Sequence, residues 1–186
     1  MERLIRSLET APVVDRGDYE YFVHPVTDGI PQVEPALLRE ISDAIIDSSA
    51  VADVDKILTA EAMGIHIATA LSLSTDLPFV IARKRSYGFD DEVPVHQETG
   101  YSESELYING IEPGDRLVIV DDVLSTGNTM AALTAAAERR DAIVESIVVV
   151  IRRDTEANVV DLPAPVTHLV AVDVVDGSVR IRDSLD

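Results

Sequence analysis

Two adjacent carboxylates, Asp121 and Asp122, follow an apolar run of the sequence and are the side chains best suited to binding a sugar or a cation. Adjacent carboxylates accept hydrogen bonds from neighbouring hydroxyls, and their oxygens are the ligands that hard cations prefer. Residues 117–120 are apolar and mostly β-branched, which predicts a strand buried on both faces of a parallel sheet. Because such strands present ligand groups at their carboxyl ends, we expect the acidic pair to lie in a binding site.

The loop after the acidic pair has the composition of a phosphate site. Gly127 allows the backbone to turn and to approach a ligand closely, and residues 130–140 predict an Ala-rich helix whose free amides and dipole attract an anion at its start. An Asp-Asp pair alone more often ends an ordinary strand, so the prediction of a sugar-phosphate site depends on the whole string. The residues of the loop are Ser125, Thr126, Gly127, Asn128 and Thr129.

Residues 118–129 resemble the signature with which type I phosphoribosyltransferases bind 5-phosphoribosyl 1-diphosphate (PRPP). That signature contains apolar residues, two acidic residues and a Thr-Gly loop with a closing Thr. The resemblance implies an enzyme that transfers 5-phosphoribose from PRPP to a nucleobase and releases diphosphate, with Mg²⁺ as its metal ion. It makes Asp121 and Asp122 catalytic residues that hold the ribose hydroxyls and Mg²⁺, and it makes residues 125–129 the site of the 5-phosphate.

A second strand-loop-helix unit precedes this signature. Residues 56–60 predict a buried strand, and a helix follows over residues 65–73. The four residues between them resemble the diphosphate loop of the family, in which a non-proline cis peptide bond is common; here that bond would join Glu61 to Ala62. Adenine-specific members carry Arg where this chain has Met63, so the diphosphate charge must be met by Mg²⁺, backbone amides or other residues. The resemblance assigns diphosphate binding to Glu61, Ala62, Met63 and Gly64.

A basic triplet, Arg83-Lys84-Arg85, ends the strand predicted over residues 79–83. Such a triplet is either an anion site or a solvated surface cluster. In the family a Lys at the equivalent place contacts the diphosphate, so the resemblance makes Lys84 a catalytic and diphosphate-binding residue and adds Arg83 to the same site.

The fold class that these segments predict is α/β, with a mostly parallel sheet flanked by helices in one domain over residues 1–186. Residues 86–104 are polar and aperiodic, which predicts a long loop; in the family a flexible loop here closes over PRPP and excludes water. The resemblance also implies a small hood over the base, built from residues 15–32 and 166–183, although a surface hairpin explains the first piece equally well. We assign base contacts to Asp28 and Ile30 in this hood.

The composition limits the class of protein. The chain has 186 residues, of which 46% are hydrophobic, and its net charge of −19 includes only two Lys residues. An acid-rich, Lys-poor chain with a good core is typical of halophilic proteins and is repelled by nucleic acids. Cys is absent and the four His residues have no zinc spacing, so we expect them to be packing or surface residues. No membrane span or signal peptide is evident, which predicts a cytoplasmic protein.

The resemblance is greatest to the archaeal group of hypoxanthine/guanine phosphoribosyltransferase-like proteins, itself similar to adenine phosphoribosyltransferase. This resemblance favours purine salvage and, because the family forms homodimers, a homodimer. It does not identify the nucleobase. Common hypoxanthine-guanine enzymes carry an Asp in the phosphate loop that takes the proton of the base, and this chain has Ser125 there. Two alternatives remain: a phosphoribosyltransferase for xanthine, orotate or another pyrimidine, and a regulatory protein that binds PRPP without turnover.

Overall fold

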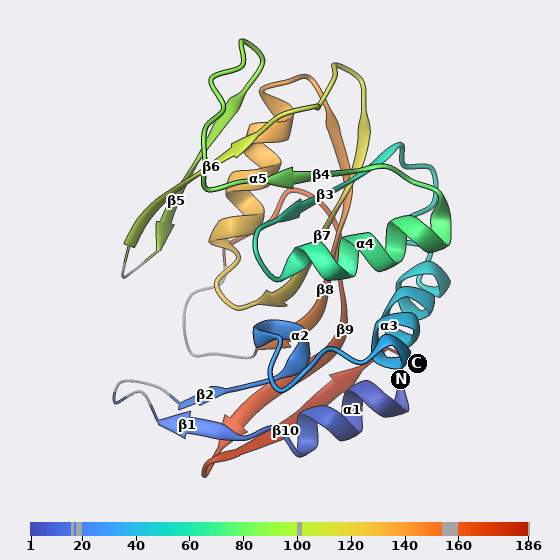
Figure 1. Cartoon of the computed structure of the whole chain (residues 1–186), viewed down its shortest axis with the longest axis vertical. Coiled ribbons are helices and arrows are strands. Elements are labelled where there is room, and N and C mark those ends of the chain that lie inside the picture. The colour runs from blue at the N-terminus through green and yellow to red at the C-terminus, as the bar shows by residue number, and fades with distance from the viewer. Residues whose placement is uncertain (16, 18–19, 100–101, 154–159, 186) are drawn as a thin grey trace.

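A six-stranded sheet forms the centre of the computed structural model, which describes residues 1–15, 17, 20–99, 102–153 and 160–185. Its members are β3 (Lys56–Ala60), β4 (Phe79–Ala82), β7 (Arg116–Leu124), β8 (Ile143–Arg153), β9 (Val166–Val175) and β10 (Ser178–Ser184). They lie in the order β10-β9-β8-β7-β3-β4, and all pairs are parallel except β9 with β10 (Figure 1). The parallel strands therefore share one carboxyl edge, where the predicted ligand loops meet.

Helices cover both faces of this sheet, which confirms the predicted fold class. The helices are α1 (Glu2–Glu9), α2 (Pro25–Asp28), α3 (Pro35–Asp47), α4 (Gly64–Thr75) and α5 (Asn128–Glu138). Alternate residues of β7 pack into two hydrophobic cores, one on each face of the sheet. Val118 and Val120 pack with apolar residues of α1, α3 and α4, whereas Leu117 and Ile119 pack with those of α5. All four are fully buried, as the period of two in a central strand requires. No helix in the described ranges is both long and apolar enough to cross a membrane.

The prediction of one long loop over residues 86–104 was wrong for most of its length. β5 (Val93–Thr99) and β6 (Ser102–Ile108) form a two-stranded antiparallel sheet, and the predicted loop persists only over residues 86–92. The strands form because Val93, Val95, Leu106 and Ile108 are buried in the core beside α5. Closure of this segment over PRPP stays a prediction, and residues 100–101 lie outside the described residues.

The amino-terminal and carboxyl-terminal segments lie side by side, as a hood built from both requires, and its position over a nucleobase stays a prediction. β1 (Val13–Asp15) and β2 (Glu20–Phe22) form a hairpin, and Arg153 donates a hydrogen bond to the carbonyl oxygen of Glu20 at 2.5 Å. The segment 166–183 instead belongs to the large sheet, because β9 pairs with β8 and its buried residues 169–172 complete the core. Figure 1 shows α1 beside β10, with α2 nearer to β7.

Candidate active site

The acidic pair lies within the last part of β7, because this strand continues to Leu124 and does not stop before Asp121 as predicted. Pairing between β3 and β7 ends at Leu58 and Ile119, so the two strands separate just before the pair. Asp121 is 8% exposed and Asp122 is 9% exposed. The two carboxylates are thus buried at the carboxyl edge of the sheet, between strands that no longer bind each other.

The electrostatics of this pair favour a cation. Burial, together with the negative charge of Asp122, raises the pKa of Asp121 well above its usual range, and burial also raises the pKa of Asp122. The N–H of Asp122 donates to Oδ1 of Asp121 at 3.0 Å. In the part of the chain that the structure describes, neither carboxylate forms an ion pair with Lys or Arg. Within those residues, no basic side chain therefore neutralises the negative charge of the pair.

The predicted phosphate loop forms a tight bend at the start of α5. Gly127 has φ +87°, the left-handed region that glycine adopts without strain, and its carbonyl oxygen accepts the N–H of Ala131 at 2.9 Å. The carbonyl oxygen of Thr126 accepts the N–H of Val160 at 2.8 Å, so the segment around residue 160 supports the bend. The first amides of a helix have no partner within it, and those of α5 begin where the 5-phosphate is predicted.

The predicted diphosphate loop joins β3 to α4. The peptide bond between Glu61 and Ala62 is cis, which confirms the prediction made from the resemblance. The N–H of Glu61 donates to the carbonyl oxygen of Ala82 at 3.0 Å and links the loop to β4. The side chain of Met63 lies beside Gly29, where an added Cβ would be 3.8 Å from its terminal carbon. The loop therefore contacts the neighbouring strand and the segment that follows α2.

Arg83 and Lys84 both meet this loop, but in different ways. Nε of Arg83 lies 2.8 Å from Oε2 of Glu61; this contact is an ion pair without hydrogen-bond alignment, since that nitrogen has no hydrogen-bond partner. The backbone N–H of Lys84 donates to Oε1 of Glu61 at 2.6 Å. Arg83 is thus held by an acidic side chain, whereas Lys84 lines the cavity described next.

A cavity of about 320 Å³ lies where these elements meet. It brings together one or more members of each predicted group: the acidic pair, the phosphate loop and the diphosphate loop. Leu106 of β6 and Val123 of β7 also line it, and both were missed because an apolar strand residue carries no local sign of a site. The lining residues are Ala60, Glu61, Ala62, Met63, Lys84, Leu106, Asp121, Asp122, Val123 and Thr129.

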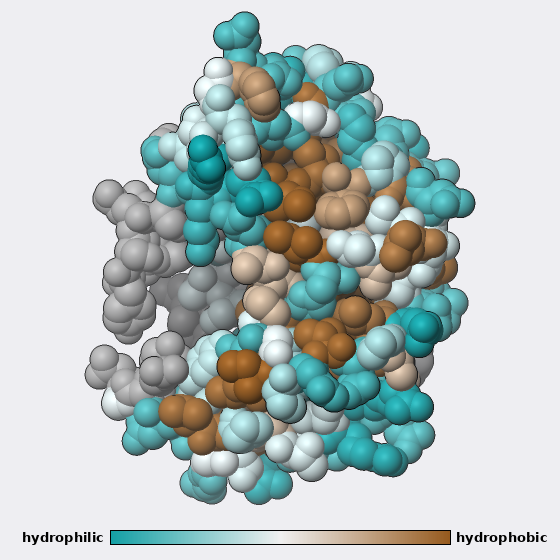
Figure 2. All heavy atoms as spheres, in the orientation of Figure 1, coloured by the Kyte–Doolittle hydropathy of each residue, from teal (hydrophilic) through white to brown (hydrophobic). Residues whose placement is uncertain are grey.

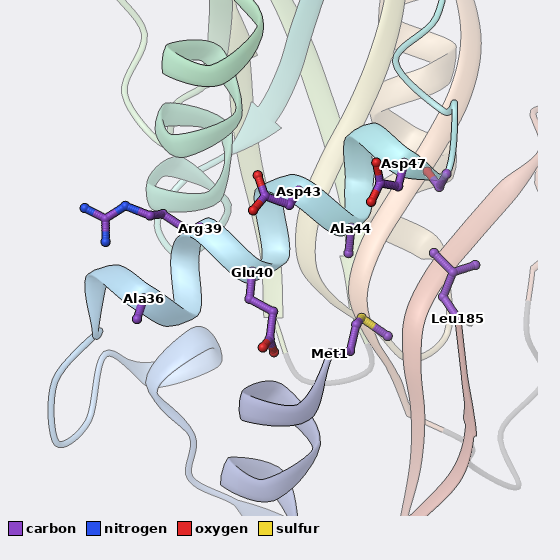
Figure 3. Close-up of a pocket in the computed structure, with 9 residues that line it drawn as sticks. Met1, Ala36, Arg39, Glu40, Asp43, Ala44, Asp47 and Leu185 are labelled. Carbon is purple, nitrogen blue, oxygen red and sulfur yellow. The ribbon is translucent and has the colours of Figure 1, made fainter.

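A larger hollow, of about 580 Å³, lies elsewhere, between α1, α3 and the carboxyl-terminal end (Figure 3). Its acidic side chains are Glu40, Asp43 and Asp47, and Figure 3 shows Glu40 extending toward α1. The carboxylate of Glu40 accepts the N–H groups of Arg3 and Leu4 at 3.2 and 2.9 Å, so it satisfies the start of α1. This hollow contains none of the predicted site residues, and the smaller cavity is the better candidate despite its size.

The two predicted base-binding residues do not line the cavity. The carboxylate of Asp28 accepts hydrogen bonds from the hydroxyl of Tyr21 at 2.7 Å and from the N–H of His24 at 2.9 Å, and it therefore stabilises its own segment. Its charge nevertheless contributes to raising the pKa of Asp122, which places it near the acidic pair. Ile30 is 57% exposed. A role in base binding stays a prediction for both residues.

Comparison with known proteins identifies relatives over almost the whole chain. A family model described as a phosphoribosyl transferase domain matches residues 32–176. The chain is 55% identical to the hypoxanthine/guanine phosphoribosyltransferase of Methanocaldococcus infernus over 182 residues, which cover 97% of this chain and 100% of that protein. It is 51% identical to HGPRTase-like protein 1 of Halalkalicoccus jeotgali over 182 residues, which cover 98% of this chain and 100% of that protein.

Among solved structures, the adenine phosphoribosyltransferase of Rhodothermus marinus superposes with a TM-score of 0.73 at 23% identity, covering 90% of this chain and 98% of that one. A likeness at this identity concerns the fold alone. The matched family region contains the acidic pair and both predicted anion loops, and it begins after Ile30.

Proposed function

This chain belongs to the phosphoribosyl transferase domain family, and we propose that it salvages purines by transferring 5-phosphoribose from PRPP to a purine base, with release of diphosphate. It is a phosphoribosyltransferase and hence a pentosyltransferase. The single observation that carries the proposal is the cavity at the carboxyl edge of the sheet, because it joins the acidic pair to Thr129 of the phosphate loop and to residues 61–63 of the diphosphate loop.

Hypoxanthine and guanine are the first bases to test. A relative with 55% identity and another with 53% identity, each matched over its full length, carry the name hypoxanthine/guanine phosphoribosyltransferase. The adenine enzymes that share the fold are far less similar in sequence, at 23% identity or below. Ser125 stands where the common hypoxanthine-guanine enzymes carry an Asp, so the base must lose its proton by another route.

The proposed chemistry is a displacement at the anomeric carbon of the ribose. A nitrogen of the base forms the new bond to this carbon, the bond to the diphosphate oxygen breaks, and the nitrogen releases its proton. Asp121 and Asp122 hold the ribose hydroxyls and stabilise the positive charge that develops at the carbon. Residues 125–129 anchor the 5-phosphate, and the loop 61–64 with Lys84 and Arg83 binds the diphosphate. Catalysis then depends mainly on positioning and electrostatics.

The acidic pair fits Mg²⁺ in the way that nucleotide-processing sites use it. Mg²⁺ is usually held by one or two carboxylates together with substrate phosphates, and seldom by a complete cage of protein ligands. Within the described residues no group of three or more acidic or His side chains is arranged to hold a metal ion, whereas Asp121 and Asp122 supply two buried, unneutralised carboxylates. When bound, Mg²⁺ would neutralise charge on the diphosphate and assist its departure.

We further propose a homodimer, as the resemblance implies. An apolar surface on α4 supports this proposal: Leu73 is 81% exposed and lines a shallow hollow with Leu38 and Ile65. Figure 2 shows apolar residues gathered across the middle of this face, with hydrophilic residues around them. A single exposed leucine is common, but one that adjoins further apolar side chains in a hollow is more typical of an interface. Light scattering during gel filtration gives the mass that checks it.

A panel of bases tests the proposed function. The purified protein is incubated with PRPP, Mg²⁺ and, in turn, hypoxanthine, guanine, adenine, xanthine and orotate, in molar KCl because of the acidic composition. We expect nucleotide and diphosphate in equal amounts with hypoxanthine or guanine. Turnover with only xanthine or orotate would assign the protein to another branch of the family. PRPP binding without turnover would make it a regulatory protein.

A further inference from the structure

The hydroxyl of Thr59 connects the two strands that carry the predicted diphosphate loop and the acidic pair. Thr59 lies in β3, is fully buried, and donates a hydrogen bond to the carbonyl oxygen of Val120 in β7 at 2.8 Å. The last paired residues of β3 and β7 are Leu58 and Ile119, so this bond is made one residue beyond the end of the backbone ladder. A side chain therefore links the strands where their main chains no longer pair.

The first residue of α4 packs against the same point. A Cβ added to Gly64 would lie 2.1 Å from Oγ1 of Thr59, 2.8 Å from Oδ1 of Asp121 and 3.2 Å from the carbonyl oxygen of Val120. The first two distances are too short for a real Cβ contact and the third is unusually short, so the main chain of the helix start lies directly on the hydroxyl and the acidic side chain. Thr59 thus contacts both halves of the site, although it does not line the cavity itself.

We propose that Thr59 is a positioning residue, whose hydroxyl sets the separation between the diphosphate loop and the acidic pair. This inference rests on the proposed function, because it concerns the two halves of the PRPP site. Val120 directly precedes Asp121, and Thr59 is two residues before Glu61, so a shift at this bond moves both groups of ligands. A reacting carbon held between the acidic pair and the leaving diphosphate is sensitive to shifts of about 1 Å.

The simpler explanation is that Thr59 only satisfies a buried carbonyl group. Both explanations predict a loss of stability on replacement, since an unpaired buried carbonyl oxygen is unfavourable. They differ in kinetics: a merely structural hydroxyl leaves the properties of the folded site unchanged, whereas a positioning hydroxyl affects the steps that use PRPP.

The variants Thr59→Val and Thr59→Ser separate these explanations. Val keeps the shape of the side chain and removes the hydroxyl, whereas Ser keeps the hydroxyl. Thr134→Val is the matched control, because Thr134 is also buried and its hydroxyl donates to the carbonyl oxygen of Met130 at 2.8 Å, within α5. We expect Thr59→Val to lower kcat/KM for PRPP about tenfold or more with little change in KM for the base, and we expect Thr59→Ser to restore most of it. Thr134→Val should keep wild-type kinetics.

A second measurement does not require activity. Amide hydrogen exchange in Thr59→Val should accelerate together at residues 61–65 and 120–123, and remain as in the wild type along β8 and β9. If the wild type shows no turnover with any base, the proposed function fails, but this exchange pattern still tests the link. Wild-type kinetics in folded Thr59→Val, no rescue by Ser, or exchange that accelerates uniformly through the sheet would each overturn the inference.

Discussion

The carboxylate of Glu61 lies between two groups that a diphosphate would use: its Oε2 is 2.8 Å from Nε of Arg83, and its Oε1 accepts the backbone N–H of Lys84 at 2.6 Å. An acidic side chain of the diphosphate loop thus contacts the neighbouring basic segment. A diphosphate bound at the proposed site would have to compete with this carboxylate for Arg83 and would be repelled by its charge.

Glu61→Gln should therefore strengthen PRPP binding. Gln keeps an oxygen that accepts the N–H of Lys84, removes the negative charge and releases Arg83. Since partly exposed ion pairs are weak, we expect KM for PRPP to fall by about two- to fivefold with kcat nearly unchanged. Steady-state kinetics with varied PRPP at one fixed salt concentration measure this change.

Glu145→Gln provides a matched control for this prediction. Glu145 accepts a hydrogen bond from Nε of Arg116 at 2.8 Å, and neither residue lines the cavity. This variant should leave KM for PRPP as in the wild type. A higher KM in Glu61→Gln would show instead that the ion pair holds Arg83 in place for the diphosphate.

Replacing both members of the acidic pair should separate activity from stability. We expect Asp121→Asn with Asp122→Asn to reduce phosphoribosyl transfer about a thousandfold or more, because both the ribose contacts and the charge that stabilises the anomeric carbon are lost. Burial raises the pKa of both carboxyls, and the charge of Asp122 raises that of Asp121 further, so their ionised forms oppose folding and Asn should not lower Tm. Unchanged turnover in this variant would refute the assignment. Asp43→Asn with Asp47→Asn, in the larger hollow, should remain active.

The local features of the site were predictable because neighbouring residues determine them. Apolar runs identified the strands that end near Ala60 and Ala82. The short residues before a predicted helix located the phosphate loop, whereas the diphosphate loop was located by its place between a strand and a helix and by the resemblance. The roles of the acidic pair and the cis bond after Glu61 came from resemblance to a family. The residue types alone predict a sugar-phosphate site, but they do not identify its reaction.

The features that were missed depend on contacts between residues distant in the chain. The strand containing Val93 and Val95 has only a short alternation next to a proline, and it is stable because it pairs with residues 102–108 and packs on α5. The ion pair of Glu61 with Arg83 joins the residues that directly follow β3 and β4, and Leu106 lines the cavity from β6. Burial at such positions is set by the folded arrangement and leaves no sign in a short window of sequence.

His24 should make the stability of the protein depend on pH. It is fully buried; its Nδ1 accepts the N–H of Val26 at 3.2 Å, and its Nε2 lies 2.9 Å from the hydroxyl of Ser7. Nδ1 can accept this bond only when unprotonated, and burial lowers the pKa of His24 to about 4. His24 is therefore a buried structural residue, as expected from the sequence.

The sign of this effect follows from where the proton binds. Above pH 6.5 the side chain is neutral in the folded and unfolded states, and it has no effect. As the pH is lowered from 6.5 to 4, only the unfolded state takes up the proton. The free energy of unfolding therefore falls by up to about 3 kcal/mol over this range. Denaturant titrations at several pH values measure the slope, and His24→Asn, which keeps a capping side chain without titrating, should flatten it over this range. Equal slopes in both proteins would contradict the assignment.

Replacement of Gly127 or of Gly114 by Ala should introduce the same backbone strain. Comparing the two variants therefore tests the role of the phosphate loop. Both glycines have φ +87°, and a Cβ at either position meets no atom closer than 3.7 Å. Ala at either site should cost about 1–2 kcal/mol in the free energy of unfolding, because the left-handed region is unfavourable for a residue with a Cβ. Gly127 begins the loop–helix junction proposed for the 5-phosphate, whereas Gly114 lies in the turn before β7. Only Gly127→Ala should therefore raise KM for PRPP, by about tenfold if the strained loop shifts its amides. Urea unfolding and PRPP saturation curves measure the two effects separately, and an equal change of KM in both variants would exclude a special role for the loop.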